Sequence, residues 1–584
     1  MRSSDSPPRR WLNLALGVGA VVLGAAITLK PYDSLDTLVL IVALGLVLTG
    51  VGDLLDHGAD HMRAPRWLQG LALVAAGVTV LILPDMTVRV VAITAGIGLV
   101  LSGSVRFLDS LRQGADERFT PLVGGLAAIL LGVTALAWRD ITVLVVALLV
   151  GPTLVIVGIG RIQAVLVSGS TLVITLHGSS TRRAGRWLRM AGATLALTVA
   201  LLLAGISAFL HRGEPEADAF YRAPANVPAE PGQLLRSEAF TRGLPEGAEA
   251  VRILYTTTRS DGTPGVASGL VLWSEGLPDG PRPVLAWAHG TTGVAETCAP
   301  SLLADPFAAG AMPALDDAIQ RGWVIVATDY IGLGTEGPHP YLIGKPAAHA
   351  VLDSVRAARQ MDAIALSDTT VVWGHSQGGA AALWTGIEAG PYAPDVPLAG
   401  VAALAPAGDL PALVGGFGGN PGGALISAFL LRGYDAIYDD VHIEDYVHSS
   451  AMPVLDEVAD RCFGEPAILV SVGELLIGEP FLTSELDQGP LAARLEENVP
   501  DDVTGLPTFF GQGLTDDLVL ADPQAAFVEE LCERGQVIEY HVYGGRDHVG
   551  VIENDSPLIP NLLAWTEARF AGEDAPTACS TSGD

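Results

Sequence analysis

A single serine lies where strand-like sequence gives way to helix-like sequence. The apolar run Val371-Val372-Trp373 is followed by Gly374-His375-Ser376-Gln377-Gly378, and then by residues rich in alanine and leucine. This Gly-x-Ser-x-Gly pattern is typical of a strand, a sharp turn and a helix, which together expose the serine hydroxyl. Glycines suit the turn because a side chain there would collide with the backbone. Because so short a pattern also arises by chance, its partners must be found elsewhere in the chain.

A serine hydroxyl needs a base to take its proton, and the base needs a carboxylate to hold its tautomer. Asp516 follows a predicted strand at residues 507–510, and His548 follows a predicted strand at residues 537–542. All three groups would then lie at the carboxyl ends of strands, where open α/β sheets place their sites. We therefore predict Ser376, Asp516 and His548 as the catalytic residues.

Other acids and bases compete for these roles. Asp517 stays open as an alternative acid, because its spacing is equally suitable. Asp547 is expected to be a loop residue, since it would have to reach backwards past the neighbouring His548. His375 adjoins the serine, but its side chain would leave the turn in another direction.

A second loop carries the groups expected to stabilise an oxyanion. A His-Gly-Thr-Thr-Gly segment begins at His289, directly after a predicted strand at residues 284–288. The small Gly290 would let the backbone N–H of Thr291 face the site, opposite the N–H of Gln377. We predict Thr291 and Gln377 as the oxyanion-hole donors, with His289 as a structural anchor of the loop.

The elements around these residues alternate between strands and helices. Such alternation implies a mostly parallel sheet covered by helices on both faces. Residues 405–500 interrupt it with a glycine-rich segment and helical sequence, which we interpret as a cap over the site, the alternative being a helical subdomain without gating. Strands are predicted at 252–257, 266–273, 284–288, 323–328, 369–373, 398–404, 507–510 and 537–542, and helices at 347–361, 377–389, 523–533 and 558–570.

Charge and hydropathy divide the 584 residues into two parts. Up to residue 212 there are 17 Lys/Arg and 11 Asp/Glu, whereas the remainder has 16 Lys/Arg and 53 Asp/Glu. So acidic a part would repel nucleic acid, and its surface suits solubility or salt tolerance. The mean hydropathy of the whole chain, +0.41, is high because the first part is very apolar.

Seven apolar stretches precede residue 212, each close to the roughly 20 residues that cross a bilayer. They lie at 11–29, 37–55, 67–83, 90–108, 119–138, 141–160 and 190–210. A cleavable signal peptide does not explain so many stretches. With the N-terminus in the cytoplasm, thirteen basic residues would lie inside and three outside, which is a positive-inside bias. An odd number of spans then places the acidic part outside the cell.

The apolar part also contains an internal repeat. Residues 44–50 recur at 97–103, and a looser copy lies at 154–158, which predicts three helical hairpins before a seventh helix. Over roughly residues 10–170 this pattern resembles the HdeD-type short-repeat membrane family. No chain of ionisable groups lies at mid-membrane, so transport is not predicted.

The acidic part resembles the secretory-lipase family of α/β-hydrolases over roughly residues 235–571. The stretches that carry the resemblance are 289–293, 329–334, 374–378, 513–519 and His548. The resemblance implies a secreted enzyme that cleaves carboxylic esters, often acylglycerols, with no metal and no organic cofactor. Such enzymes have a cleavable signal peptide, whereas the multi-span half of this chain favours a tethered enzyme.

All four cysteines lie in the acidic part, which suits disulfides in an oxidising compartment, although buried thiols would give the same pattern. From the residues alone three connectivities are open. The resemblance implies one bond near the oxyanion loop and cap, which gives the pairs Cys298–Cys462 and Cys532–Cys579.

We therefore expect an α-helical multi-span membrane domain followed by an α/β-hydrolase domain with a helical cap insertion. The boundaries are a membrane domain at 1–212, an extracytoplasmic linker at 213–250, the hydrolase at 251–571 with a cap at about 405–500, and a tail at 572–584. The expected activity is that of a plasma-membrane, extracellular serine lipase or carboxylesterase acting on lipid esters. The alternatives are a peptidase or acyltransferase using the same residues, or a non-catalytic binding domain.

Overall fold

A computed structural model describes residues 118–137, 179–210, 216–276, 280–417, 421–448, 451–464 and 481–583, with scattered positions between 14 and 112. Its contacts divide the chain into two compact units, and each is described by itself. The first comprises Met1–Arg212, Ser449–Val454 and Ile477–Phe481, and the second comprises Gly213–His448, Leu455–Leu476 and Leu482–Asp584.

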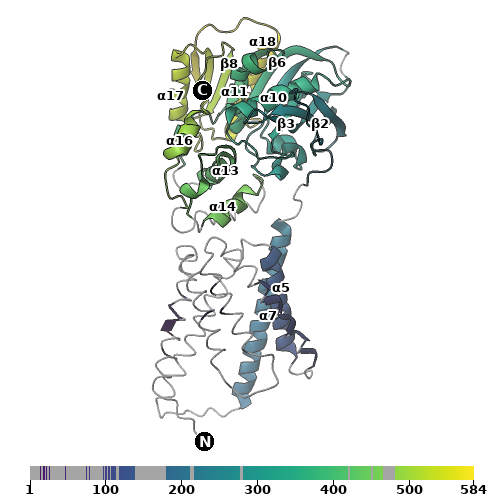
Figure 1. Cartoon of the computed structure of the whole chain (residues 1–584), viewed down its shortest axis with the longest axis vertical. Helices are drawn as coiled ribbons and strands as arrows, with labels where there is room; N and C mark the ends of the chain where they lie inside the picture. The colour runs from purple at the N-terminus through teal and green to yellow at the C-terminus, as the bar shows by residue number, and fades with distance from the viewer. Residues whose placement is uncertain are drawn as a thin grey trace. The chain divides into compact units, whose positions relative to one another are not determined.

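Two of the seven predicted apolar helices fall largely within the described residues of the first unit. They are α5 (Phe119–Ala137) and α7 (Ser179–Leu210), which pack against each other (Figure 1). Glycines bring α5 close to a neighbouring segment, since a Cβ on Gly132 would lie 2.7 Å from the backbone oxygen of Gly96. Small residues of this kind allow helix backbones to approach closely.

In the described part of the chain, no helix combines the length and the apolarity that crossing a bilayer requires. The other five predicted spans lie wholly or partly outside the described residues. The multi-span arrangement and its orientation therefore stay predictions.

The second unit is built on one ten-stranded sheet with the order β1-β2-β3-β5-β4-β6-β7-β8-β9-β10. The pairs from β5 through β4 to β10 are all parallel, and the three pairs at the β1 end are antiparallel. The predicted mostly parallel sheet is therefore present. The strands are β1 (Leu234–Phe240), β2 (Ala248–Thr258), β3 (Pro264–Ser274), β4 (Arg282–Ala288), β5 (Val324–Ile331), β6 (Leu366–His375), β7 (Leu398–Leu404), β8 (Thr508–Gly513), β9 (Ile538–Tyr543) and β10 (Ser580–Gly583).

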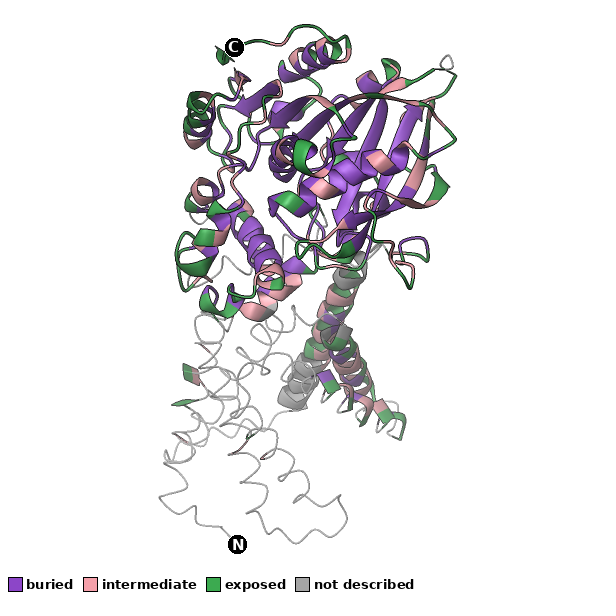
Figure 2. Ribbon diagram, turned by 45° about the horizontal axis from the view of Figure 1, so that its top comes forward, coloured by how far each residue is buried: buried purple, intermediate pink, exposed green. Residues whose placement is uncertain are grey.

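Helices cover both faces of this sheet. Successive residues of a strand point to opposite sides, so neighbouring residues pack against different helices. On β6, Val371 and Trp373 belong to one apolar cluster and Val372 to the other. Most of the sheet is accordingly buried (Figure 2). One cluster includes α9 (Leu315–Gln320) and α18 (Leu558–Phe570), and the other includes α10 (Gly344–Ala358), α11 (Gln377–Tyr392) and α17 (Ala521–Glu533).

Two segments predicted to lie outside the hydrolase are part of its sheet. The predicted linker at 213–250 contains β1, which pairs with β2, and the predicted tail at 572–584 contains β10, which pairs with β9. Proline and glutamate around β1, and the polar sequence of β10, concealed both strands. Backbone hydrogen bonds to a neighbouring strand can hold such edge segments without a strong apolar pattern.

Where it is described, the segment predicted as a cap consists of helices joined by turns and irregular chain. It contains α12 (Leu410–Gly415), α13 (Pro421–Ile437), α14 (Met452–Ala459) and α16 (Gly489–Glu496). The middle of α13 is the apolar centre of this region, since Phe429, Leu430 and Tyr434 are fully buried.

Candidate active site

Ser376 occupies the turn between β6 and α11 with a positive φ of 57°. Its backbone N–H donates to the oxygen of Leu404 at 2.9 Å, which fixes the turn against β7. The flanking glycines are required by close packing. A Cβ on Gly374 would lie 1.9 Å from the oxygen of Gly378, and one on Gly378 would lie 1.9 Å from the oxygen of Ala288.

The loops after β8 and β9 bring an acid and a histidine to this serine. His548 Nε2 lies 2.9 Å from Ser376 Oγ, and His548 Nδ1 lies 2.8 Å from Asp516 Oδ2. All three side chains are buried. The neighbouring Asp517 is exposed, so Asp516 is the carboxylate that faces the histidine. The geometry is that of a nucleophile, a base and an orienting acid.

The carboxylate of Asp516 is held by three further donors. Its Oδ1 accepts the backbone N–H groups of Leu518 (2.9 Å) and Val519 (2.8 Å), and its Oδ2 also accepts Gln512 Nε2 at 3.2 Å. Gln512 is fully buried and was not predicted as a site residue. The only signal in the sequence was a long polar side chain near the end of an otherwise apolar strand.

The rival histidine beside the serine has a different contact. His375 Nε2 donates to the backbone oxygen of His548 at 2.9 Å, and the two rings lie 4.9 Å apart. Burial lowers the pKa of His375 to about 3, so its ring is neutral. His375 therefore supports the loop that carries His548.

His289 and Asp547 have local partners. The ring of His289 contacts the backbone oxygens of Gly290 (2.6 Å) and Asp329 (3.3 Å), and burial lowers its pKa to about 4. Asp547 accepts the backbone N–H of Gly550 at 2.7 Å. Neither contacts Ser376, in agreement with the structural roles expected for them.

The two predicted oxyanion donors belong to separate elements. Thr291 lies in the loop after β4 and Gln377 is the first residue of α11. Within the described residues, neither backbone N–H donates to a protein acceptor. Their side chains are engaged elsewhere, since Thr291 Oγ1 lies 2.8 Å from Tyr341 Oη and Gln377 Nε2 lies 3.1 Å from His339 Nε2.

The four cysteines form two disulfides, with the pairing that the family resemblance implied. Cys298 is bonded to Cys462, which joins the segment after the oxyanion loop to the cap, and Cys532 of α17 is bonded to Cys579 just before β10. In the described ranges, no three His, Cys, Asp or Glu side chains are placed to hold a metal ion.

Two family models match the chain. Residues 311–578 match the secretory lipase family, and residues 15–71 and 68–126 match a short repeat of unknown function. The C-terminal half thus matches a family of lipases. The N-terminal match agrees with the short-repeat resemblance, although the multi-span nature of that half is not shown by it.

Several relatives align with the C-terminal half. A "probable inactive lipase" of Mycobacterium tuberculosis is 26% identical over 62% of this chain and 83% of its own length. Lipase A of Moesziomyces aphidis is 24% identical over 66% of this chain and 87% of its own. A secreted triacylglycerol lipase of Malassezia globosa is 25% identical over 62% of this chain and 81% of its own.

Solved structures agree on the fold. Candida antarctica lipase A superposes with a TM-score of 0.54 and 21% identity, over 64% of this chain and 90% of that one. Its closed state gives a TM-score of 0.52 with the same coverage and identity. The C-terminal half thus has the fold of these structures, and its sequence is similar to lipases and esterases of the α/β-hydrolase type.

Proposed function

We propose that this half is a serine carboxylic ester hydrolase acting on acylglycerol-type esters. The observation that carries the proposal is the continuous contact from Ser376 Oγ through His548 to Asp516, at 2.9 and 2.8 Å. Strained backbone at the nucleophile and two N–H groups without protein acceptors support the same reading.

In the proposed reaction Ser376 Oγ attacks the ester carbonyl carbon while its proton passes to His548 Nε2. Asp516 holds the Nδ1–H and stabilises the imidazolium that forms. The backbone N–H groups of Thr291 and Gln377 would receive the developing oxyanion. The carbon–oxygen bond to the leaving alcohol then breaks, and the alcohol takes the proton from His548. Water, deprotonated by His548, attacks the acyl-enzyme and releases the acid with a free serine.

An extracytoplasmic place for this reaction is part of the proposal. Two disulfides in the lipase half suit an oxidising compartment. The positive-inside bias of the N-terminal half independently supports a place outside the plasma membrane for residues after 212. We propose that the N-terminal half tethers the enzyme to that membrane through about seven spans.

The activity is tested with p-nitrophenyl esters of graded acyl length and with peptide substrates, using the full-length protein and its Ser376→Ala variant. Ester hydrolysis that disappears in the variant is expected. Cleavage of peptides but of no ester would replace the lipase with a peptidase, and equal rates in the variant would remove the proposed nucleophile. Inactivity on all substrates would favour a non-catalytic binding domain; the mycobacterial relative is named a probable inactive lipase.

The placement is tested separately by adding protease to intact cells. We expect cleavage near residues 213–233 and release of the lipase half. Its survival on intact cells, with cleavage after lysis, would contradict the outward orientation.

A further inference from the structure

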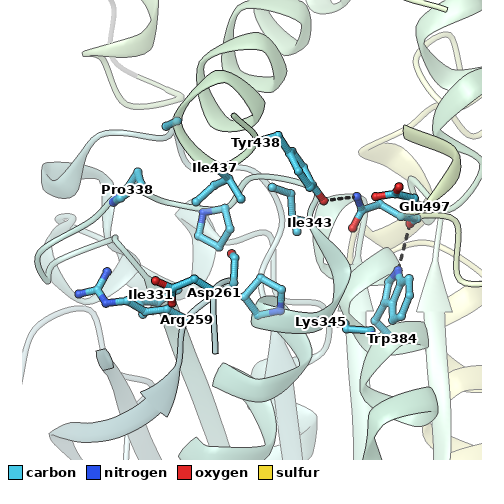
Figure 3. Close-up of a pocket in the computed structure, with 15 residues that line it drawn as sticks. Arg259, Asp261, Ile331, Pro338, Ile343, Lys345, Trp384, Ile437, Tyr438 and Glu497 are labelled. Carbon is cyan, nitrogen blue, oxygen red and sulfur yellow. Dashed lines mark hydrogen bonds between the residues drawn. The ribbon is translucent and has the colours of Figure 1, made fainter. Parts of the chain in front are cut away.

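A cleft of about 660 Å³ lies beside the candidate active site, between the core of the hydrolase and its cap (Figure 3). The core side includes Lys345 and Trp384, and the cap side includes Ile437 and Tyr438. Asn498 joins the two sides, because its side chain donates to Tyr438 Oη at 2.7 Å and its backbone oxygen accepts Trp384 Nε1 at 3.0 Å. A ligand in this cleft would therefore contact core and cap together.

A single stretch of chain separates the cleft from the candidate catalytic residues. Pro338, Pro340 and Ile343 line the cleft. Between them, His339 contacts the side chain of Gln377, and Tyr341 contacts the side chain of Thr291. His339 and Tyr341 therefore lie between the residues that line the cleft and the predicted oxyanion-hole residues Gln377 and Thr291.

Lys345 is an unusual residue for this half of the chain. The whole sequence has two lysines, Lys30 and Lys345. Lys345 is therefore the only lysine after position 212, a part of the sequence that contains 53 acidic residues. Of the 16 basic residues there, eight form ion pairs with carboxylates of the described chain. Lys345 has no hydrogen-bonding or ionic partner in that part of the chain.

Arg259, the second cation of the cleft, forms no salt bridge within the described residues. Arg259 donates only to the backbone oxygens of Glu336 and Gly337, at 3.3 and 3.4 Å. The two carboxylates of the lining are already engaged. Glu497 is paired with Arg494 at 2.7 Å, and Asp261 accepts both the N–H and the hydroxyl of Thr263. Arg259 interacts electrostatically with Asp261, whereas Lys345 is exposed and has no carboxylate partner in the described chain, so Lys345 is the cation available to a ligand.

The rest of the lining is largely apolar. Ile331, Ile343 and Trp384 are buried side chains at the floor, and Ile437 is partly exposed on the cap side. In Figure 3, Arg259 and Asp261 lie toward one end and Lys345, Trp384 and Glu497 toward the other. Clefts of roughly 300–1,000 Å³ that combine apolar walls with a few placed polar groups are typical of small-molecule sites.

We propose that this cleft binds a single-chain anionic amphiphile, a carboxylate of medium chain length, apart from the catalytic residues. The carboxylate pairs with Lys345, and the hydrocarbon chain lies against Ile343, Trp384 and Ile437. Such an acid is the class of product that ester hydrolysis releases, and one bound here would hold core and cap together. Binding itself requires no hydrolysis, so it can be measured in a chain that lacks the nucleophile.

The two-lysine composition provides a site-specific assay. The full-length Ser376→Ala protein is treated with a water-soluble acetylating succinimidyl ester, and modification of Lys345 and Lys30 is followed by mass spectrometry. We expect octanoate to slow acetylation of Lys345 at least fivefold in a saturable way, and to leave Lys30 unchanged. Acetate, octanol and octylammonium at the same concentrations should protect far less, because each lacks either the chain or the negative charge.

A variant pair tests the apolar part of the site. Ile437→Ser should weaken the protection by octanoate several-fold, whereas Val503→Ser, at an exposed apolar residue outside the cleft, should not change it. Equal protection by acetate would show that the site recognises the carboxylate without the hydrocarbon chain. Equal protection by octylammonium would refute a role for the negative charge. Absence of saturable protection by octanoate would overturn the proposal. Because the assay is independent of turnover, such a failure leaves the ester hydrolase proposal intact, and protection with no ester hydrolysis would refute only the latter.

Discussion

The ring of His375 donates a hydrogen bond of 2.9 Å to the backbone oxygen of His548, so the residue before the proposed nucleophile supports the loop that carries the proposed base. The two residues are 173 positions apart in the chain. His548 Nε2 contacts Ser376 Oγ at 2.9 Å, and His375 directly precedes Ser376 in the chain. A shift of either histidine would therefore change this contact.

Replacing His375 tests this support. His375→Phe removes the donor but keeps a ring, and a lost buried hydrogen bond of about 1 kcal/mol corresponds to a roughly fivefold to tenfold lower kcat. We expect KM to change little and His375→Gln, which keeps an N–H, to recover part of the rate. Steady-state kinetics on a soluble ester measure kcat and KM of both variants. A His375→Phe protein with normal kcat and only a lower Tm would show that the contact serves stability alone.

Gln512 is expected to position the carboxylate of Asp516. Gln512→Leu removes the 3.2 Å donor to Asp516 Oδ2 and should lower kcat about tenfold, and Gln512→Glu should lower it further by placing a second carboxylate there. The matched control is Gln524→Leu, at a buried glutamine of α17 whose Nε2 has no partner in the described chain. Equal loss of activity in the control would mean that any buried glutamine has this effect.

Gly378, two residues after Ser376, should tolerate no side chain. In Gly378→Ala the new Cβ would lie 1.9 Å from the backbone oxygen of Ala288, so either the turn or β4 must move. We expect a loss of activity of at least a hundredfold, or failure to fold. Gly390→Ala in the same helix meets nothing within 4 Å apart from its chain neighbours and should leave ester hydrolysis unchanged. Thermal unfolding and ester hydrolysis of both variants check this.

Acid should weaken the folded state of the C-terminal half before most carboxylates titrate. Burial lowers the pKa of His289 and His339 to about 4 and that of His375 to about 3. Histidine in the unfolded chain titrates near 6.5, so their contribution to stability is present above that pH and is lost as the pH falls toward 4. Burial raises the pKa of Asp353 to about 6 and also raises that of Asp329, and their opposite contributions are lost as the pH rises. Burial lowers the pKa of His349 as well, so four histidines oppose two aspartates.

The measurement is the denaturant midpoint of unfolding of the full chain between pH 8 and pH 4. His339→Gln should flatten the profile, and His442→Gln, at an exposed position, should leave it unchanged. A midpoint that rises on acidification would contradict the assignment of neutral buried histidines.

The two disulfides should differ in what they support. Cys298–Cys462 closes a separation of 164 residues and Cys532–Cys579 one of 47, so by loop entropy the first contributes about 1 kcal/mol more. We expect the double substitution Cys298→Ser and Cys462→Ser also to raise KM, because it frees the cap from the segment after the oxyanion loop. The double substitution Cys532→Ser and Cys579→Ser should lower the stability to unfolding and leave KM unchanged. Equal effects on KM would remove this distinction.

Much of the fold followed from local patterns. The apolar runs predicted β4, β6 and β7 closely, because a strand buried on both faces needs consecutive apolar residues. The edge strands β1 and β10 were missed, since what holds them is pairing with β2 and β9. Hydrogen bonds between backbones do not depend on side-chain type, so they leave little trace in a sequence.

The sequence by itself determined the order of Ser376, Asp516 and His548, and their places after strands, because each belongs to a short segment whose turn or loop chemistry is local. Only the tertiary structure decided which of two adjacent aspartates faces the histidine, since Asp516 is buried and Asp517 exposed. It also placed Gln512 against that acid, His375 against the loop of the base, and Lys345 in a cleft beside the site. Those contacts join groups through packing of strands, helices and cap, which no neighbouring residues encode.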